Sequence, residues 1–197
     1  MPIRDTYTTT EPANATYAYT EIADGMGYVS FKGFNTGSSG AATYDLTQST
    51  LYSNNVETSG AALWTFNTSQ FKLPRIMEGT AIVRFSVASY HAMGGISYWY
   101  AELQHISGVT ATSLGFGFGE AFTVGAGTTI PHNYTLPITI PLTNLKEGDS
   151  LRLIITPGGA TFYYLAHDPA DRDGYVINPA STYPTKLEVF VPFKIDV

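Results

Sequence analysis

The stretch KLEVFVPFKI, Lys186–Ile195, carries the clearest pattern in the sequence. Every second residue in it is large and apolar: Leu187, Val189, Val191, Phe193 and Ile195. Because successive side chains of a β-strand point to opposite faces, this period of two predicts a strand with one buried face. We expect it to be the closing strand of the fold.

The same period recurs along most of the chain. Gly79–Tyr90 sets Val83 and Phe85 against Arg84 and Ser86, and this segment is expected to be a central strand. A strand is also expected in each of six further segments: Gly27–Phe34, Leu51–Val56, Leu63–Phe71, Ile96–Ile106, Tyr134–Leu142 and Ser150–Thr156.

Two of these segments indicate where they lie in a sheet. In Ile96–Ile106, the face that holds Trp99 is expected to enter the core, so the face with Tyr98 and Tyr100 meets solvent or a partner. Tyr134–Leu142 contains two prolines, which cannot donate to a β-ladder. We therefore expect Tyr134–Leu142 to be an edge strand.

These patterns favour an all-β fold. No window resembles an amphipathic helix, because Gly, Pro or β-branched residues interrupt every candidate. About eight strands without βαβ spacing predict an antiparallel β-sandwich, two sheets packed face to face. A jelly roll is preferred over an immunoglobulin-like sandwich because the connections around 35–62, 107–133 and 157–185 are long and uneven. Residues 26–197 are expected to form this single domain.

Residues 1–25 show no clean period and are interpreted as an extended N-terminal arm. Four side chains in it are costly to expose to water: Tyr7, Tyr17, Tyr19 and Ile22. The arm is either a loose terminus or a segment that packs on a neighbouring subunit.

The composition excludes several classes of partner and binding site. The formal net charge is −6 with only 10 Lys and Arg, which argues against nucleic acid as a partner. The sequence has no cysteine, so disulfides and Cys-ligated zinc are excluded. No apolar run approaches the roughly 18 residues of a membrane span, and the start MPIRDTYTTTEP lacks the apolar core of a secretion signal. We expect no membrane partner and assembly in a cytoplasm.

No motif indicates catalytic, cofactor-binding or metal-binding residues. The loop His167–Gly174 is rich in carboxylates, but its register does not fit a Ca²⁺ loop, so an Asp-Gly turn is preferred. Gly115–Gly119, a GFGFG run, is expected to be a strand that another backbone or ring approaches closely. A Ser/His/Asp site assembled from distant loops stays open, but we expect the protein not to be an enzyme.

Exposed aromatic residues are the best candidates for a functional surface. They could stack on sugars, anchor a protein interface, or simply complete the core and its rim. Together with the four arm residues named above, the candidate partner-binding residues are Tyr98, Tyr100, Tyr163, Tyr164 and Tyr175.

A resemblance supports the structural interpretation. The arm before Asp24–Tyr28, the turn Leu145–Leu151 and the closing Thr185–Phe193 together resemble the small jelly-roll structural proteins of tailed bacterial viruses (bacteriophages). That family includes capsid decoration (cement) proteins and short fibre or spike heads.

The resemblance implies a virion structural protein, a decoration or minor capsid protein that stabilises the shell. It would be a homotrimer on the capsid or tail surface, with the major capsid protein or another virion protein as its partner. The alternative is a carbohydrate- or receptor-binding module that uses Tyr-rich loops to hold a glycan.

Overall fold

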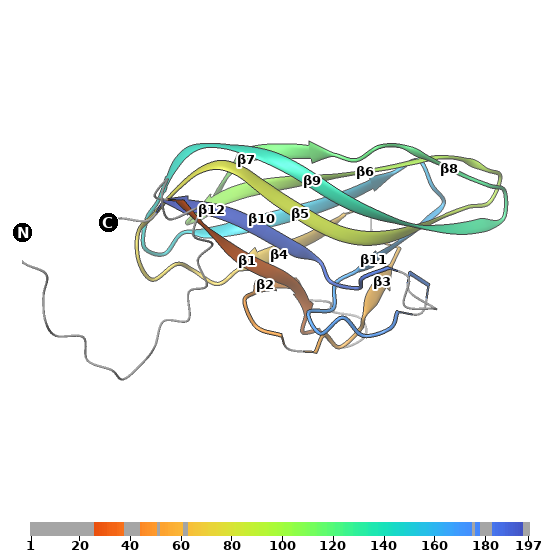
Figure 1. Ribbon diagram of the computed structural model, residues 1–197, viewed down its shortest axis with the longest axis horizontal. Coiled ribbons are helices and arrows are strands. Elements are labelled where there is room, and N and C mark those ends of the chain that lie inside the picture. The colour runs from red at the N-terminus through yellow and green to blue at the C-terminus, as the bar shows by residue number, and fades with distance from the viewer. Residues whose placement is uncertain are drawn as a thin grey trace, which may run out of the picture.

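The computed structural model describes residues 26–37, 44–50, 52–60, 63–174, 176–177 and 183–194. These residues form strands and loops, and none of them is helical, so none forms a helix able to cross a membrane. The all-β prediction is confirmed (Figure 1). The strands are β1 (Met26–Asn35), β2 (Tyr44–Thr47), β3 (Glu57–Ser59), β4 (Trp64–Thr68), β5 (Arg75–His91), β6 (Gly95–Ser107), β7 (Thr110–Phe118), β8 (Phe122–Val124), β9 (Thr128–Leu145), β10 (Ser150–Gly158), β11 (Phe162–Ala166) and β12 (Glu188–Lys194).

One continuous sheet folds onto itself to make the two layers. Its strand order is β3-β11-β5-β12-β1-β2-β4-β10-β6-β7, with β9 paired to β5 and β8 to β6. All ladders are antiparallel except the short one between β2 and β4. At β2 the sheet passes from the layer of β5, β12 and β1 to the layer of β4, β10 and β6 (Figure 1).

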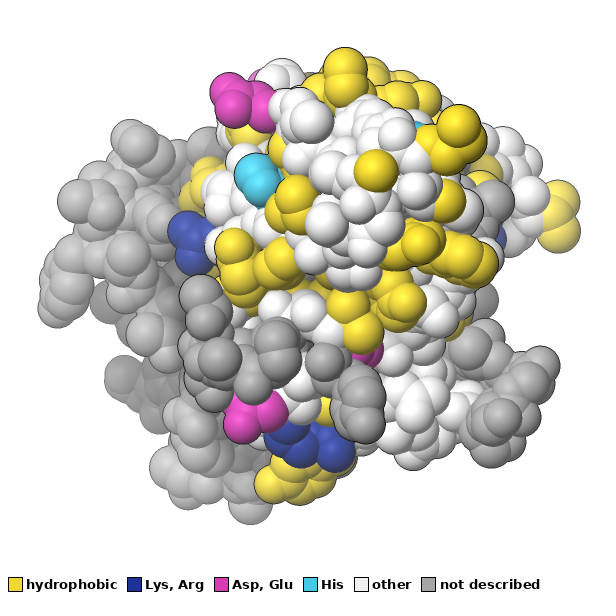
Figure 2. Space-filling view, turned by 90° about the vertical axis from the view of Figure 1, so that its right-hand side faces the viewer, with side chains coloured by type: hydrophobic (Ala, Val, Ile, Leu, Met, Phe, Trp, Pro, Cys, Tyr) yellow, Lys and Arg dark blue, Asp and Glu magenta, His cyan; other side chains and the backbone are white. Residues whose placement is uncertain are grey.

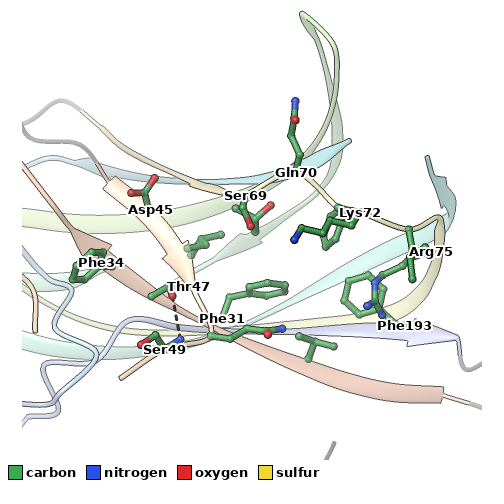
Figure 3. A pocket seen from close by; sticks show the side chains of 16 residues that line it. Phe31, Phe34, Asp45, Thr47, Ser49, Ser69, Gln70, Lys72, Arg75 and Phe193 are labelled. Atoms are coloured by element: carbon green, nitrogen blue, oxygen red, sulfur yellow. Dashed lines mark hydrogen bonds between the residues drawn. The ribbon is translucent and has the colours of Figure 1, made fainter. Parts of the chain in front are cut away.

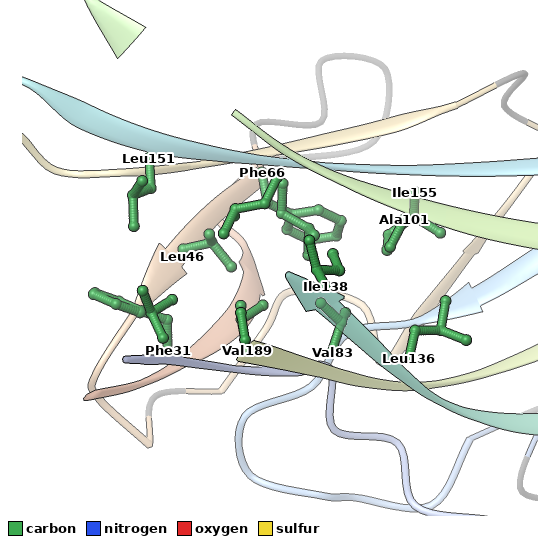
Figure 4. Close-up of a cluster of buried hydrophobic side chains, with 14 of the residues drawn as sticks. Phe31, Leu46, Phe66, Val83, Ala101, Leu136, Ile138, Leu151, Ile155 and Val189 are labelled. Carbon is green, nitrogen blue, oxygen red and sulfur yellow. The ribbon is translucent and has the colours of Figure 1, made fainter. Parts of the chain in front are cut away.

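The core lies between these layers. Figure 4 shows Leu151, Ile155 and Ala101 of one layer meeting Val83 and Val189 of the other. Two tryptophans, Trp64 and Trp99, stack with ring centroids 5.7 Å apart and are almost fully buried. Burying a large apolar side chain stabilises a fold by about 2 kcal/mol, so this shared core holds the layers together.

Most predicted strands are present. The closing segment and Gly79–Tyr90 form β12 and β5, and β5 is a central strand, bordered by β9 on one side and by β12 and β11 on the other. The strand predicted over Leu51–Val56 is wrong, because the described residues 52–56 form a loop that leads into β3. The expected N-terminal arm, residues 1–25, lies outside the described residues.

The three long connections contain further strands. β2 and β3 lie in the first, β7 and β8 in the second and β11 in the third. These strands are short or carry Gly and Thr instead of large apolar residues, so their alternation is weak in the sequence.

β9 is an edge strand, as its prolines predicted. It pairs with β5 along almost its whole length. Its second edge faces β7 without a hydrogen-bonded ladder. Pro137 and Pro141 are therefore tolerated, because neither is needed as a donor on that side.

The turn between β9 and β10 is fixed by a buried carboxylate. Asp149 Oδ2 accepts a hydrogen bond from the Lys146 amide at 2.8 Å and lies 2.7 Å from His105 Nε2. The Lys146 amide bond lowers the pKa of Asp149 to about 2, although burial opposes the shift. Asp149 thus stays ionised and holds the turn well below neutral pH.

Candidate functional site

A row of apolar side chains points outward from β6. Ile96 and Tyr98 are 59% and 49% exposed, and Tyr100 is half-buried next to them in the same row. The intervening Trp99 is buried, as predicted. The alternation of the strand thus aims three apolar side chains away from the core.

The GFGFG run extends this row onto β7. Gly115 and Gly117 face β9, where an added Cβ of Gly115 would lie 2.7 Å from Thr139 O and one of Gly117 2.9 Å from Leu136 Cβ. Phe116 and Phe118 point the other way and are 47% and 74% exposed. The close backbone approach predicted from the glycines is confirmed.

The rings of β6 and β7 form one surface. Tyr100 is directly opposite Phe118, with ring centroids 5.7 Å apart, and Phe118 stacks on Phe116 at 6.1 Å. We call Ile96, Tyr98, Tyr100, Phe116 and Phe118 the aromatic face. On their inner side these strands pack against the fold through Trp99, Gly115 and Gly117, so the rings project outward from paired strands.

Further apolar side chains are exposed at the adjoining end of the molecule. Met93, in the turn from β5 to β6, is 88% exposed, and Phe162 is 52% exposed beside Tyr90. Figure 2 looks onto this end, where hydrophobic side chains gather with few charged ones among them. Apolar patches of this kind commonly mark interaction sites.

The other predicted partner-binding residues lie elsewhere. Tyr163 packs edge-on against Trp99 with centroids 5.7 Å apart, and its hydroxyl accepts a hydrogen bond from the Ala160 amide. Tyr164 packs against the small cluster of Ala88, Ala166 and Ile177. Both side chains are half-buried in structural contacts. Tyr7, Tyr17, Tyr19, Ile22 and Tyr175 lie outside the described residues.

A buried polar cluster brings Ser53, His167 and Asp168 together. The Ser53 hydroxyl donates to the backbone oxygen of His167 at 2.8 Å and not to its ring. Asp168 accepts from the Ser53 amide at 3.1 Å and from Arg172 Nε at 2.8 Å. These bonds fix a loop to β11 and lack the hydroxyl-to-imidazole contact that a nucleophile and its base require.

His167 is buried in the same region. Its Nε2 lies 3.1 Å from Thr58 Oγ1, which also accepts hydrogen bonds from Trp64 Nε1 and Tyr44 Oη. Burial lowers the pKa of His167 to about 4, so the ring is neutral at pH 7. The sequence pattern placed His167 only in a carboxylate-rich loop, because the side chains around its ring come from three separate strands, β2, β3 and β4.

The carboxylates of the 167–174 loop are used within the fold. Asp168 binds Arg172, and Asp171 accepts from the Thr185 amide at 2.8 Å and lies 3.2 Å from Lys186 Nζ. Within the described ranges no group of three or more His, Cys, Asp or Glu is placed to hold a metal ion.

A groove of about 780 Å³ opens between β1 and the segment 68–75. Figure 3 shows Phe31 and Phe193 on one side of it and Gln70 and Lys72 on the other. The groove thus combines an apolar floor with polar walls.

Comparison with known proteins finds a shared fold but no family. No family model and no curated protein matches the sequence. A CocE/NonD family hydrolase from Staphylococcus aureus matches with a TM-score of 0.53, and an aminopeptidase from a marine sediment archaeon (Thaumarchaeota archaeon) with 0.54. Each is 8% identical, and each match covers 85% of this chain and 37% of the other. The infectious bursal disease virus structure (Gt strain) reaches a TM-score of 0.29 at 11% identity, with 88% and 37% covered, which is too low for a fold argument.

The hydrolase matches correct one expectation. The sequence patterns predicted a protein that is not an enzyme, and this prediction is contradicted by a fold that also forms part of hydrolases. The reason is that a β-sandwich does not by itself indicate a function. At this identity the likeness shows the fold alone, and the chain spans just over a third of the proteins it matches.

Proposed function

We propose that this protein is a structural assembly protein, a virion component of the capsid-decoration type, whose copies associate as a homotrimer through the aromatic face. The observation that carries the proposal is the exposure of Phe116 and Phe118 on a strand paired with β6. Exposed rings of this size cost free energy in water, and their burial between subunits recovers it.

Identical copies suit this surface. A closed cyclic assembly uses the same patch on every subunit, and an aromatic patch is well suited to repeated contact. In cross-strand register, Phe118 is opposite Tyr100, so two rings meet at the centre of the patch, whereas Phe116 is opposite Glu102, which places one carboxylate beside it.

Phe118→Ser tests the proposal. We expect the wild-type protein to have the mass of three chains by light scattering at about 10 μM, and the variant that of one chain, because removing a central aromatic anchor costs 2 kcal/mol or more. Leu142→Ser is the matched control, since Leu142 is 58% exposed on β9, away from the aromatic face. It should remain trimeric. A monomeric wild type, or a trimeric Phe118→Ser, would contradict the proposal.

Carbohydrate binding is the second candidate. Tyr98 lies over Gly158, where an added Cβ would meet the ring at 2.2 Å, and the residue is 49% exposed, so part of the ring is accessible for stacking. If a glycan is the ligand, wild-type protein binds a specific sugar on an array and Tyr98→Ala binds at least about tenfold more weakly. An array without signal for the wild type would exclude this role.

A further inference from the structure

One edge of β1 is unpaired along the groove. β1 pairs with β12 from Met26 to Lys32 on one side, but with β2 only from Lys32 to Asn35 on the other. Among the described residues, the second edge of the Gly27–Phe31 stretch therefore has no strand beside it. An unpaired edge beside an apolar groove is a template for another strand.

The hydrogen-bonding groups that face this edge can be assigned. Successive residues of a strand direct their backbone groups to opposite edges. The Gly33 amide donates to Leu187 O, on the β12 side, at 2.8 Å. Tyr28 and Ser30 therefore direct their amides and carbonyls toward the groove. Pro192 of β12 is consistent with this assignment. It is opposite Tyr28 and has no amide to donate, so Tyr28 does not need to hydrogen-bond on the β12 side.

We propose that residues 18–23 of this chain, which lie outside the described residues, fold back through a two-residue turn at Asp24-Gly25 and occupy the groove as a strand antiparallel to β1. Twenty-five residues precede Met26, where β1 begins at the end of the free edge. Asp-Gly between two strands is the strongest short-range signal for a β-hairpin.

A two-residue turn pairs the proposed strand with the β1 residues whose backbone groups face the groove. A two-residue turn at 24–25 makes Ala23 and Met26 a hydrogen-bonded pair, and then Glu21 with Tyr28 and Tyr19 with Ser30. These are the β1 residues whose backbone groups face the groove. A turn one residue longer or shorter would shift the register, so that the hydrogen-bonding groups of the inserted strand would no longer be opposite those of Tyr28 and Ser30.

The side chains also fit. Residues directly opposite in such a pair point to the same face, and Val29 and Phe31 line the groove. Ala18 and Thr20, which are small, would lie beside Phe31 and Val29. Ile22 would lie opposite Gly27, which has no side chain to obstruct it.

The far wall of the groove can hold the strand on its other side. Phe71 exchanges backbone hydrogen bonds with Asp149 and Gly148, at 2.8 and 2.9 Å. Gln70 and Lys72, on either side of Phe71, line the groove. The inserted strand would then bridge β1 and this segment, as β2 bridges β1 and β4 above it.

Amide hydrogen exchange on the full chain, followed by NMR, tests the proposal. We expect the Tyr28 and Ser30 amides to exchange at least about 100-fold more slowly than in an unfolded peptide. Glu21→Pro, which removes a ladder amide, should abolish this protection, while the matched variant Glu11→Pro should keep it. Phe118→Ser should keep it as well, which separates this result from the test of the aromatic face.

A disulfide provides a second measurement that does not depend on how Glu21→Pro folds. The chain has no cysteine, so a pair at Thr20→Cys and Val29→Cys is free of competing thiols. It should form a disulfide within the monomer, whereas Thr9→Cys with Val29→Cys should not. Fast exchange at Tyr28 and Ser30 in the wild type would overturn the proposal. So would protection that is lost on dilution, or a disulfide between chains, because both assign the groove to a second copy.

Discussion

Replacing Arg172 by alanine is expected to lower the free energy of unfolding by about 2 to 3 kcal/mol. Its guanidinium donates from Nε and Nη2 to Asp168, at 2.8 and 3.2 Å, and Asp168 is completely buried. Removing one partner of such a pair leaves a buried charge uncompensated. The loss stays below the upper range for buried pairs because the Ser53 and Arg172 amides still donate to Asp168.

The effect should depend on pH. Burial raises the pKa of Asp168, but the hydrogen bonds from Arg172 outweigh it and hold the pKa below its ordinary value. In the wild type this stabilisation is present above pH 4 and is lost as the pH falls further. In Arg172→Ala the largest contribution that lowers the pKa of Asp168 is lost, so the carboxyl takes up a proton at a higher pH than in the wild type and the deficit should shrink as the pH falls toward 4.

Urea unfolding of both proteins, followed by tryptophan fluorescence, measures this difference. Arg152→Ala is the matched control, since Arg152 Nε donates to the neutral Asn67 side chain at 2.9 Å on a partly exposed face. We expect it to cost less than about 1 kcal/mol. Equal losses for the two variants would show that Asp168 does not depend on Arg172.

Gly115→Ala is expected to cost about 3 kcal/mol. The added Cβ would lie 2.7 Å from Thr139 O and 3.0 Å from Ile138 Cγ2, and the first of these is backbone in a strand paired with β5. Overpacking against atoms that cannot move typically costs 1 to 3 kcal/mol, and here β7 would be forced away from β9. The aromatic face, which β7 carries, would be displaced with it.

Gly108→Ala is the control for the glycine substitution. Gly108, in the turn before β7, has a φ of 59°, and an added Cβ would meet nothing within 4 Å. Alanine there costs about 1 kcal/mol of backbone strain only. Thermal melts of the two variants should therefore differ by several degrees. A Gly115→Ala protein as stable as Gly108→Ala would mean that β7 does not pack closely on β9.

The candidate tyrosines show which exposed side chains the pattern of a single strand can predict. Tyr98 and Tyr100 could be placed on an outer face because Trp99 fixes which face of their strand is buried. Tyr163 and Tyr164 lie in a segment without such a reference, so its local pattern does not distinguish them from exposed rings. Tyr163 instead packs on Trp99, a residue 64 positions earlier, which no pattern within its own segment could indicate.

The sequence by itself determined the β class, the strands β1, β4, β5, β6, β9, β10 and β12, the edge position of β9 and the close approach at the glycines of β7. All of these follow from local stereochemistry: side chains alternate, proline lacks an amide and glycine lacks a Cβ. Only the tertiary structure decided the fold-over of the sheet at β2, the aromatic face, the Asp168–Arg172 cluster and the free edge of β1. Each of these depends on which distant segments come into contact, and that is set by the packing of the whole core.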